Sequence, residues 1–210
     1  MEPIDIEEIK SKLPLPYKGL AESLVKIGKV VDLPAGHEIL REGQYVKFVP
    51  ILLSGLVKVV TRGEMKDLLL YYIKPGESCV MSFIHALSQQ PCNIYAIAEE
   101  PTKALIIPSQ ELDGLIRDSA DFNKLFHELS NQRYTDLLDT INEVFFLNLE
   151  ERMLKYLRNK TALTDVKDLN ATHQEIARDL GTAREVVSRT LKKLENQGKI
   201  ELVREGIRLL

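Results

Sequence analysis

The sequence predicts an α+β protein in which an antiparallel β-roll, a long helix and a helix-turn-helix with a hairpin wing follow one another. Three observations support this prediction. Short runs rich in Val, Ile and Leu alternate with glycine turns over the first half of the chain. A helical apolar period then extends over residues 121–147. Near the end, two capping motifs separated by a glycine indicate a pair of short helices.

The first predicted domain covers residues 1–117. After a proline-containing leader, a small helix is expected from Leu20 to Ile27. Strands are expected at 30–33, 38–40, 49–53, 56–60, 68–73, 94–98 and 104–107. Turn signals such as Pro34-Ala35-Gly36 and Pro75-Gly76 separate them at the even spacing of a compact antiparallel barrel or roll. Ser109 can then cap a short helix that runs through Ile116.

A long helix is the main feature of the second segment, residues 118–147. Apolar side chains recur there at steps of three or four residues, although Gln132 and Arg133 interrupt the stripe. At about 1.5 Å per residue the helix would be about 40 Å long, more than one small roll can cover. We therefore favour a seam between two copies of the chain over an amphipathic helix packed on its own domain. The expected seam positions are Phe122, Phe126, Leu129, Leu137, Ile141 and Val144.

The third predicted domain, residues 148–210, contains the helix-turn-helix. Asn148 fits a helix N-cap, and residues 161–170 are expected to form a polar loop or short strand. Thr172-His173-Gln174-Glu175 is a capping box for a helix through Leu180, and Gly181 allows a left-handed turn. Thr182-Ala183-Arg184-Glu185 is expected to be a second capping box, for a helix through Leu194. Two helices joined by such a turn are the helix-turn-helix pattern.

The second of these helices has the chemistry of a major-groove reader. Val186 or Val187, Leu191 and Leu194 are expected to point inward, so that the opposite face carries Arg184, Glu185, Ser188, Arg189 and Lys192. Arginine can donate to guanine O6 and N7, glutamate can accept from cytosine N4, and serine can pair with either kind of edge. After Gly198, residues 199–210 are expected to form a β-hairpin wing, where Arg204 or Arg208 could contact phosphate. This pattern predicts double-stranded DNA as a partner.

Charge is distributed unequally along the chain, which has a net charge of −3. Residues 1–147 carry 15 Lys and Arg against 21 Asp and Glu, whereas residues 148–210 carry 13 against 10. A basic C-terminal domain suits a nucleic-acid partner. No apolar run is long enough to span a bilayer and the start of the chain is acidic, so we expect a cytoplasmic protein with no membrane partner.

Composition argues against an enzyme or a metalloprotein. The two cysteines, Cys79 and Cys92, are too few for a disulfide framework or a four-thiolate cluster, and we expect buried free thiols. His37, His85 and His127 show no metal spacing, and His85 is expected to be a hydrogen-bonded structural residue. There is no nucleophile elbow, phosphate-binding glycine loop or HExxH motif. We therefore predict no catalytic residue, no metal and no cofactor.

The residues already named resemble those of the cyclic-AMP receptor protein and FNR family of transcription regulators, over nearly the whole chain. The resemblance is most specific at residues 172–177, Leu180-Gly181 and 184–189, and it extends to residues 33–36, Glu42-Gly43, 54–57 and 75–77. It implies a jelly-roll sensor domain like those that bind cyclic nucleotides, a dimerisation helix and a winged helix-turn-helix. It also implies a homodimer on an inverted-repeat operator, with RNA polymerase as a further partner.

The resemblance also implies roles for single residues. The family's base readers fall on Arg184, Glu185 and Arg189, with Ser188 as in the FNR branch. Thr172, His173, Gln174 and Thr182 fall near its phosphate-contacting positions, where His173 replaces an arginine seen in some members. To these we add Lys192 and Arg204 as predicted phosphate contacts.

The sensor segment departs from the pattern of cyclic-AMP binders. Pro91-Cys92 stands where those proteins have an Arg-Ser or Arg-Thr pair, and Val80-Met81 where they have Gly-Glu. Residues 75–102 contain no Lys or Arg, and burying a phosphate without a cationic partner is costly. We therefore expect that cyclic AMP is not bound in the family's usual manner. The effector stays unknown, constitutive activity is open, and a sensor that acts through protein contact with a C-terminal domain unable to bind DNA is the alternative function.

Overall fold

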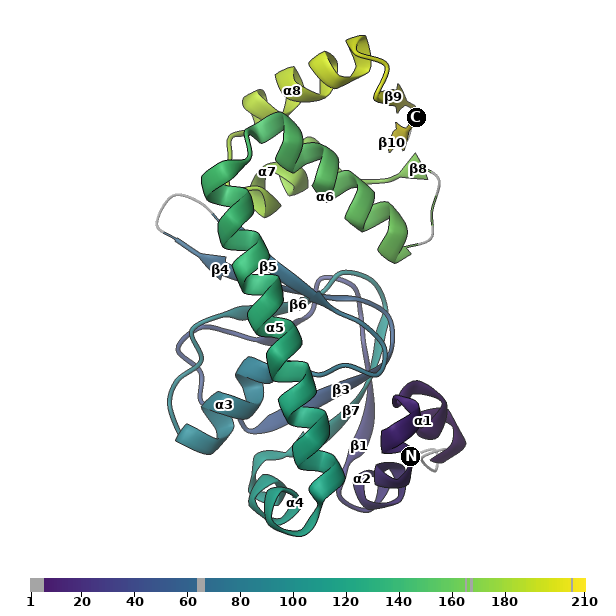
Figure 1. The fold of residues 1–210 in the computed structure, drawn as a ribbon, viewed down its shortest axis with the longest axis vertical. Coiled ribbons are helices and arrows are strands. Elements are labelled where there is room, and N and C mark those ends of the chain that lie inside the picture. The colour runs from purple at the N-terminus through teal and green to yellow at the C-terminus, as the bar shows by residue number, and fades with distance from the viewer. Residues whose placement is uncertain (1–5, 64–66, 165, 167, 205) are drawn as a thin grey trace. The chain divides into compact units, whose positions relative to one another are not determined.

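The computed structural model describes residues 6–63, 67–164, 166, 168–204 and 206–210, and the ribbon in Figure 1 shows their course. The chain forms two compact units. The first comprises the described residues up to Thr61 together with Leu70–Leu137, and the second comprises those of Arg62–Leu69 and Leu138–Leu210. Each unit has its own apolar core, so each is described by itself.

Two antiparallel sheets make up the roll. One has the strand order β1 (Lys29–Leu33), β7 (Thr102–Pro108), β3 (Phe48–Ser54). The other has the order β2 (Glu38–Leu40), β6 (Tyr95–Ala98), β4 (Val57–Arg62), β5 (Asp67–Ile73). Gly55 has φ +88°, and a Cβ there would lie 2.7 Å from Thr102 Cα, so this turn requires glycine. These sheets confirm the predicted antiparallel roll and, with the helices below, the α+β class.

Several helices surround the roll. The predicted small helix is α2 (Ala21–Ile27), preceded by α1 (Ile6–Lys12) and the 3₁₀ turn η1 (Leu15–Leu20). The leader was not expected to be helical, nor was the apolar stretch that forms α3 (Val80–Ser88). The short helix after the roll comprises the 3₁₀ turn η2 (Ser109–Glu111) and α4 (Leu112–Asp118). No side-chain cap is present there, so the prediction that Ser109 caps this helix is wrong.

The long helix α5 (Ala120–Phe146) forms as predicted, but part of the predicted seam is corrected. Phe122 and Leu129 are 1% and 7% exposed and belong to the core of the roll, against which Phe126 also packs. Leu137 packs against a second roll cluster with Leu52, Ile73 and Cys79. These four side chains bury their apolar surface within their own chain because the helix lies along the roll for much of its length.

A different set of apolar positions on α5 is exposed. Ile141 and Val144, both predicted, are 50% and 42% exposed. With them are exposed Tyr134, Leu138, Phe145 and Phe146. Tyr134, Leu138, Ile141 and Phe145 follow one another at steps of four, three and four residues, the spacing of a coiled-coil seam. We call these four residues the exposed stripe.

The second unit is a helix-turn-helix with a small sheet. Its helices are α6 (Leu149–Thr164), α7 (His173–Asp179) and α8 (Arg184–Asn196), and its strands β8 (Asp168–Leu169), β9 (Ile200–Val203) and β10 (Gly206–Leu209) have the order β8-β10-β9. The prediction of a polar loop or short strand over 161–170 is partly wrong, because residues 161–164 complete α6. The short strand that this prediction allowed does form, as β8. The hairpin wing is confirmed, with Leu202 opposite Ile207.

Candidate nucleic-acid interface

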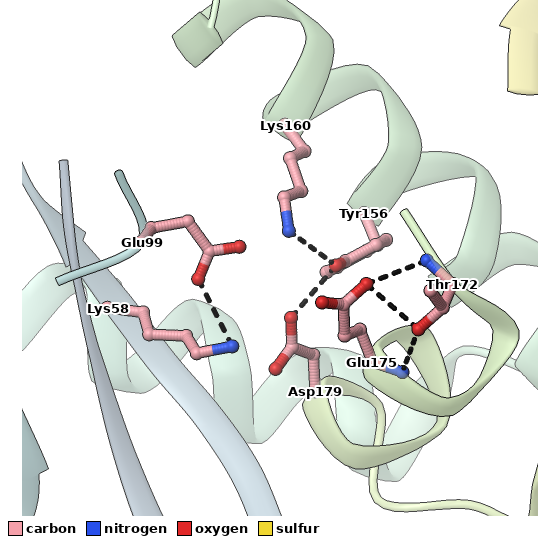
Figure 2. Close-up of polar contacts among 7 residues, drawn as sticks. All are labelled: Lys58, Glu99, Tyr156, Lys160, Thr172, Glu175 and Asp179. Atoms are coloured by element: carbon pink, nitrogen blue, oxygen red, sulfur yellow. Dashed lines mark hydrogen bonds and ion pairs between the residues drawn. The ribbon is translucent and has the colours of Figure 1, made fainter. Parts of the chain in front are cut away.

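The first helix of the helix-turn-helix begins with the predicted capping box. Thr172 Oγ1 accepts a hydrogen bond from the Glu175 backbone N–H at 3.2 Å, and the Thr172 N–H donates to Glu175 Oε2 at 2.7 Å. Figure 2 shows this reciprocal pair. The predicted cap at Asn148 also forms, because Asn148 Oδ1 accepts from the Glu151 N–H at 3.1 Å. These two caps fix where α7 and α6 begin.

The second helix begins one residue later than predicted. Its N-cap is Ala183, with no side-chain cap, so the prediction of a second capping box at Thr182 is wrong. The backbone makes the turn instead: Gly181 has φ +62°, and the Thr182 N–H donates to the Ala177 carbonyl at 2.9 Å. Thr182 itself is half-buried. Glu185 therefore lies in the first turn of α8 without a reciprocal cap partner.

Apolar packing decides which face of α8 is outward. Val187, Leu191 and Leu194 are fully buried, and they join Ile176, Ala177 and Leu180 of the preceding helix in one core cluster. The uncertainty between Val186 and Val187 is thus resolved in favour of Val187, since Val186 is only half-buried. With this face inside, Arg184, Glu185 and Arg189 are exposed. Within the described parts of the chain, none of these three side chains has an ion pair or hydrogen-bond partner.

Ser188, also predicted as a base reader, is engaged within the protein. Its hydroxyl donates to the Arg184 carbonyl at 3.1 Å, and its Oγ lies 2.8 Å from Nδ1 of His173. Ser188 is half-buried, whereas its neighbour Arg189 is exposed. The arrangement connects the first residue of α7 to the outward face of α8.

The remaining predicted phosphate contacts are placed differently. Gln174 on α7 and Arg204 at the wing turn are exposed. Lys192 is exposed but ion-paired with Glu195 at 2.6 Å. Glu195 also accepts from the Leu202 N–H at 3.1 Å, and these two contacts lower the pKa of its carboxyl. Sequence reasoning missed Arg178, an exposed cation one helical turn after Gln174, although the four-residue spacing on one helix face indicates it.

Arg208, the other wing arginine considered for phosphate, is held in the sheet. It stands opposite both Asp168 and Glu201 in the strand register. Its Nε and Nη2 donate to the Asp168 carboxylate at 2.6 and 2.8 Å, and its Nη1 donates to Glu201 at 2.9 Å. The two carboxylates raise the pKa of Arg208, Asp168 having the larger effect. Arg208 therefore stabilises the wing from within it.

Polar contacts also hold α6 against the two helices. Tyr156 Oη donates to Asp179 Oδ2 at 2.8 Å and accepts from Lys160 Nζ at 3.2 Å, as Figure 2 shows. Glu150 near the start of α6 accepts from Lys193 at 2.6 Å and from Lys199 at 3.3 Å. Hydrogen bonds from Lys193 first, and then from Gln197, lower the pKa of Glu150 to about 2. These contacts connect α6 to α8 and to the start of the wing.

Two cations of the roll, Lys58 and Arg133, form ion pairs within it. On the sheet, Lys58 and Glu99 form an ion pair of 3.1 Å. Arg133 is buried, donates to the Tyr72 carbonyl at 2.7 Å, and pairs with Glu77 and Asp136 at 3.1 and 3.2 Å. This explains why a cation interrupts the apolar stripe of α5: its charge is balanced where it is buried.

The roll's histidine and thiols are structural in their placement. Nε2 of His85 lies 3.0 Å from Asn93 Oδ1, which confirms the expected hydrogen bond. Both cysteines are buried and free, as predicted. Burial raises the pKa of the Cys79 thiol to about 11 and also raises that of Cys92. Among the described residues, no group of three or more His, Cys, Asp or Glu is placed to hold a metal ion, and no helix is long and apolar enough to cross a membrane.

Comparison with known families identifies both parts of the chain. A model of the cyclic nucleotide-binding domain matches residues 30–119, and a model of the Crp-like helix-turn-helix domain matches residues 145–210. The chain belongs to the CRP/FNR family of transcription regulators. Members of the CRP/FNR family are DNA-binding regulators rather than enzymes, so the predicted function class is confirmed at this level.

Individual members of the CRP/FNR family match most of the chain. The CRP-like cAMP-activated global transcriptional regulator of Mycobacterium tuberculosis is 24% identical over 190 residues, which are 86% of this chain and 83% of that protein. A crystal structure of a CRP/FNR-family regulator from Eubacterium rectale has a TM-score of 0.82 at 23% identity, covering 95% of this chain and 94% of that one. The c-di-GMP-responsive global regulator CLP of Xanthomonas campestris has a TM-score of 0.80 at 20% identity, covering 91% and 98%. The two structures share the fold of this chain.

Proposed function

We propose that this CRP/FNR-family regulator acts as a homodimer that recognises an inverted-repeat operator with the first turns of its two α8 helices. The observation that carries the proposal is that Arg184, Glu185 and Arg189 at the start of α8 are exposed and have no side-chain partner among the described residues. Their side chains need not break an internal ion pair before they meet a base edge. Arginine and glutamate at this place have the donor and acceptor groups that guanine and cytosine complement.

The remaining residues of this surface would fix the register on the duplex. We assign phosphate contacts to Thr172, His173, Gln174, Thr182, Lys192 and Arg204, and we add Arg178. Contacts of this kind supply affinity and orientation without sequence choice. Ser188 is assigned a supporting role in place of direct base reading, because its hydroxyl already donates to the Arg184 carbonyl.

The exposed stripe of α5 supports pairing of two copies. Tyr134, Leu138, Ile141 and Phe145 are between 42% and 77% exposed and have coiled-coil spacing. Two such helices packed along this stripe would remove large apolar side chains from water, which favours association. A symmetric pair places its reading helices in successive major grooves about 34 Å apart, which is why we propose an inverted repeat.

An effector in the roll would differ from conventionally bound cyclic AMP. No Lys or Arg occurs between Pro75 and Thr102, and the buried cation Arg133 is already balanced by Glu77 and Asp136. A phosphate entering this region would therefore be desolvated without a cation from that segment, and Arg133 is already paired. An effector without a phosphate, or constitutive activity, fits these residues better. We further propose that the protein works in the cytoplasm with RNA polymerase as a partner, as a regulator of transcription does.

Selection of bound sequences from random DNA with the purified protein, with and without cell extract, tests this function. We expect an inverted repeat with half-sites one helical turn apart. Because several cations meet phosphates, the affinity should also fall steeply with salt, and the slope should be about −0.9 per phosphate neutralised. Recovery of no enriched sequence, together with a flat salt dependence, would contradict DNA recognition and support a regulator that acts by protein contact.

A further inference from the structure

The beginning of α8 includes two proposed base readers but contributes no fully buried side chain to the core. Its N-cap, Ala183, makes no side-chain hydrogen bond, and the two residues that follow it are exposed. The first fully buried side chain of the helix is Val187, and the others, Leu191 and Leu194, lie further along. Core packing therefore anchors the middle and the end of α8 more firmly than its beginning.

A polar contact joins this part of α8 to the preceding helix. Ser188 Oγ lies 2.8 Å from Nδ1 of His173, the first residue of α7, and 3.1 Å from the Arg184 carbonyl oxygen. A separation of 2.8 Å between the hydroxyl and the ring nitrogen is a hydrogen bond whichever of the two atoms supplies the hydrogen. In either arrangement the bond holds α7 to α8 one helical turn from Arg184.

Sequence recognition depends on how accurately a reading side chain is placed. An arginine that pairs with guanine must align two donors with O6 and N7 at once. A binding group of this kind has to be held within about 0.5 Å of its productive position, and contacts behind it supply that precision. A contact that fixes the beginning of α8 therefore affects the choice of sequence, although it touches no base.

We propose that His173 is a positioning residue for sequence recognition, because its bond to Ser188 fixes the beginning of α8 and so the place from which Arg184 meets a base. The inference rests on the proposed function, since it needs DNA on this face. It adds to the phosphate contact assigned to His173, because that contact would use the other ring nitrogen. The bond to Ser188 then serves specificity, and the phosphate contact serves affinity.

Two amide substitutions separate these two roles of His173. The asparagine amide ends near the place of Nδ1 and can either donate or accept, so His173→Asn can keep the bond to Ser188 whichever atom supplies the hydrogen. The glutamine amide lies one carbon further out, near the place of Nε2. His173→Gln therefore gives up the bond to Ser188 while it can still reach a phosphate. Ser188→Ala breaks the same bond from the side of α8.

The test measures the ratio of the affinity for the selected operator to the affinity for random DNA, by fluorescence anisotropy at fixed pH and salt. His173→Gln and Ser188→Ala should each lower this ratio by about two- to tenfold, which corresponds to the loss of one hydrogen bond. The variant with both substitutions should lose no more than either alone, because both remove the same interaction. His173→Asn should keep the ratio within about twofold of the wild-type value, whether or not the two affinities fall together.

Gln174→Ala is the matched control at the next position of α7. Gln174 is exposed and is proposed to contact phosphate only, so its loss should leave the ratio unchanged. Circular dichroism checks that each variant is folded, and His173→Gln and Ser188→Ala test the bond independently if one of them is not. Equal losses of the ratio in His173→Asn and His173→Gln, additive losses in the double variant, or an unchanged ratio in Ser188→Ala would overturn the inference while leaving DNA recognition intact. Equal affinity of the wild type for all DNA would instead refute the proposed function, and this inference with it.

Discussion

Replacing Arg184 by alanine should weaken binding to the operator far more than binding to random DNA. Arg184 is exposed in the first turn of α8, and its side chain has no internal partner among the described residues. It can therefore bind a base without first breaking a hydrogen bond or ion pair within the protein. A bidentate arginine–guanine pair contributes about 1–3 kcal/mol of discrimination, equivalent to about 5- to 150-fold in affinity. Because the side chain is exposed, the unfolding free energy should change by less than about 0.5 kcal/mol.

Lys192→Ala is the comparison that isolates the base contact. Lys192 is on the same helix but is paired with Glu195 at 2.6 Å, so a phosphate must compete with a carboxylate for it. Its loss should weaken binding to the operator and to random DNA about equally. The slope of log affinity against log salt concentration should become less steep by about the contribution of one phosphate contact or less. Both variants are measured by fluorescence anisotropy on the operator, on a half-site with the paired guanine replaced, and on random DNA. Equal losses on all three for Arg184→Ala would refute its role in sequence choice.

Three other predictions concern stability and assembly. Leu191→Ala, at a fully buried position beside Val187, should lower the unfolding free energy by about 2–5 kcal/mol in urea denaturation, and a loss below about 1 kcal/mol would contradict the packing. Leu138→Asp should weaken dimerisation at least about tenfold in sedimentation equilibrium. Asn142→Asp, at an exposed position of the same helix, should leave dimerisation unchanged. Equal effects of the two substitutions would refute pairing through the exposed stripe. Glu150 has a folded pKa of about 2, lowered from 4.5, so its stabilisation is present above pH 4.5 and is lost as pH falls towards 2. Glu150→Gln should flatten acid unfolding in that window by circular dichroism, and an unchanged acid transition would contradict the lysine pairing.

The elements that follow a strong local rule could be predicted from the sequence. The roll strands are bounded by glycine turns, and Gly55 and Gly181 have positive φ angles that other residues rarely adopt. The capping box at Thr172 consists of residues three apart, so its geometry is determined within one helical turn. The helix α3 lacked such signals: its N-cap Cys79 makes no side-chain cap, and six of its nine residues are apolar.

What could not be predicted depends on contacts between distant residues. The hydrogen bond between His173 and Ser188 joins residues fifteen positions apart, and the sequence alone presented Ser188 as a free base reader. The start of α8 at Arg184 was placed one residue early because Thr182 and Glu185 match a capping box by spacing. In the structure, the Thr182 backbone continues the turn from Ala177, which leaves its side chain without that role.

The two faces of α5 show why periodicity alone could not place the dimer seam. The spacing that joins Phe122 to Leu129 is also the spacing that joins Leu138 to Phe145, since both follow from the same helical period. Only the packing distinguishes them: the first pair is buried in the roll, and the second is 42% and 77% exposed. Arg133 lies on the roll-facing side, where Glu77 and Asp136 balance its charge, so it interrupts the buried stripe without interrupting the exposed one. One face of α5 packs against the roll, and another face leaves large apolar side chains exposed to water. Burying this second face against a second copy of the chain would favour dimerisation.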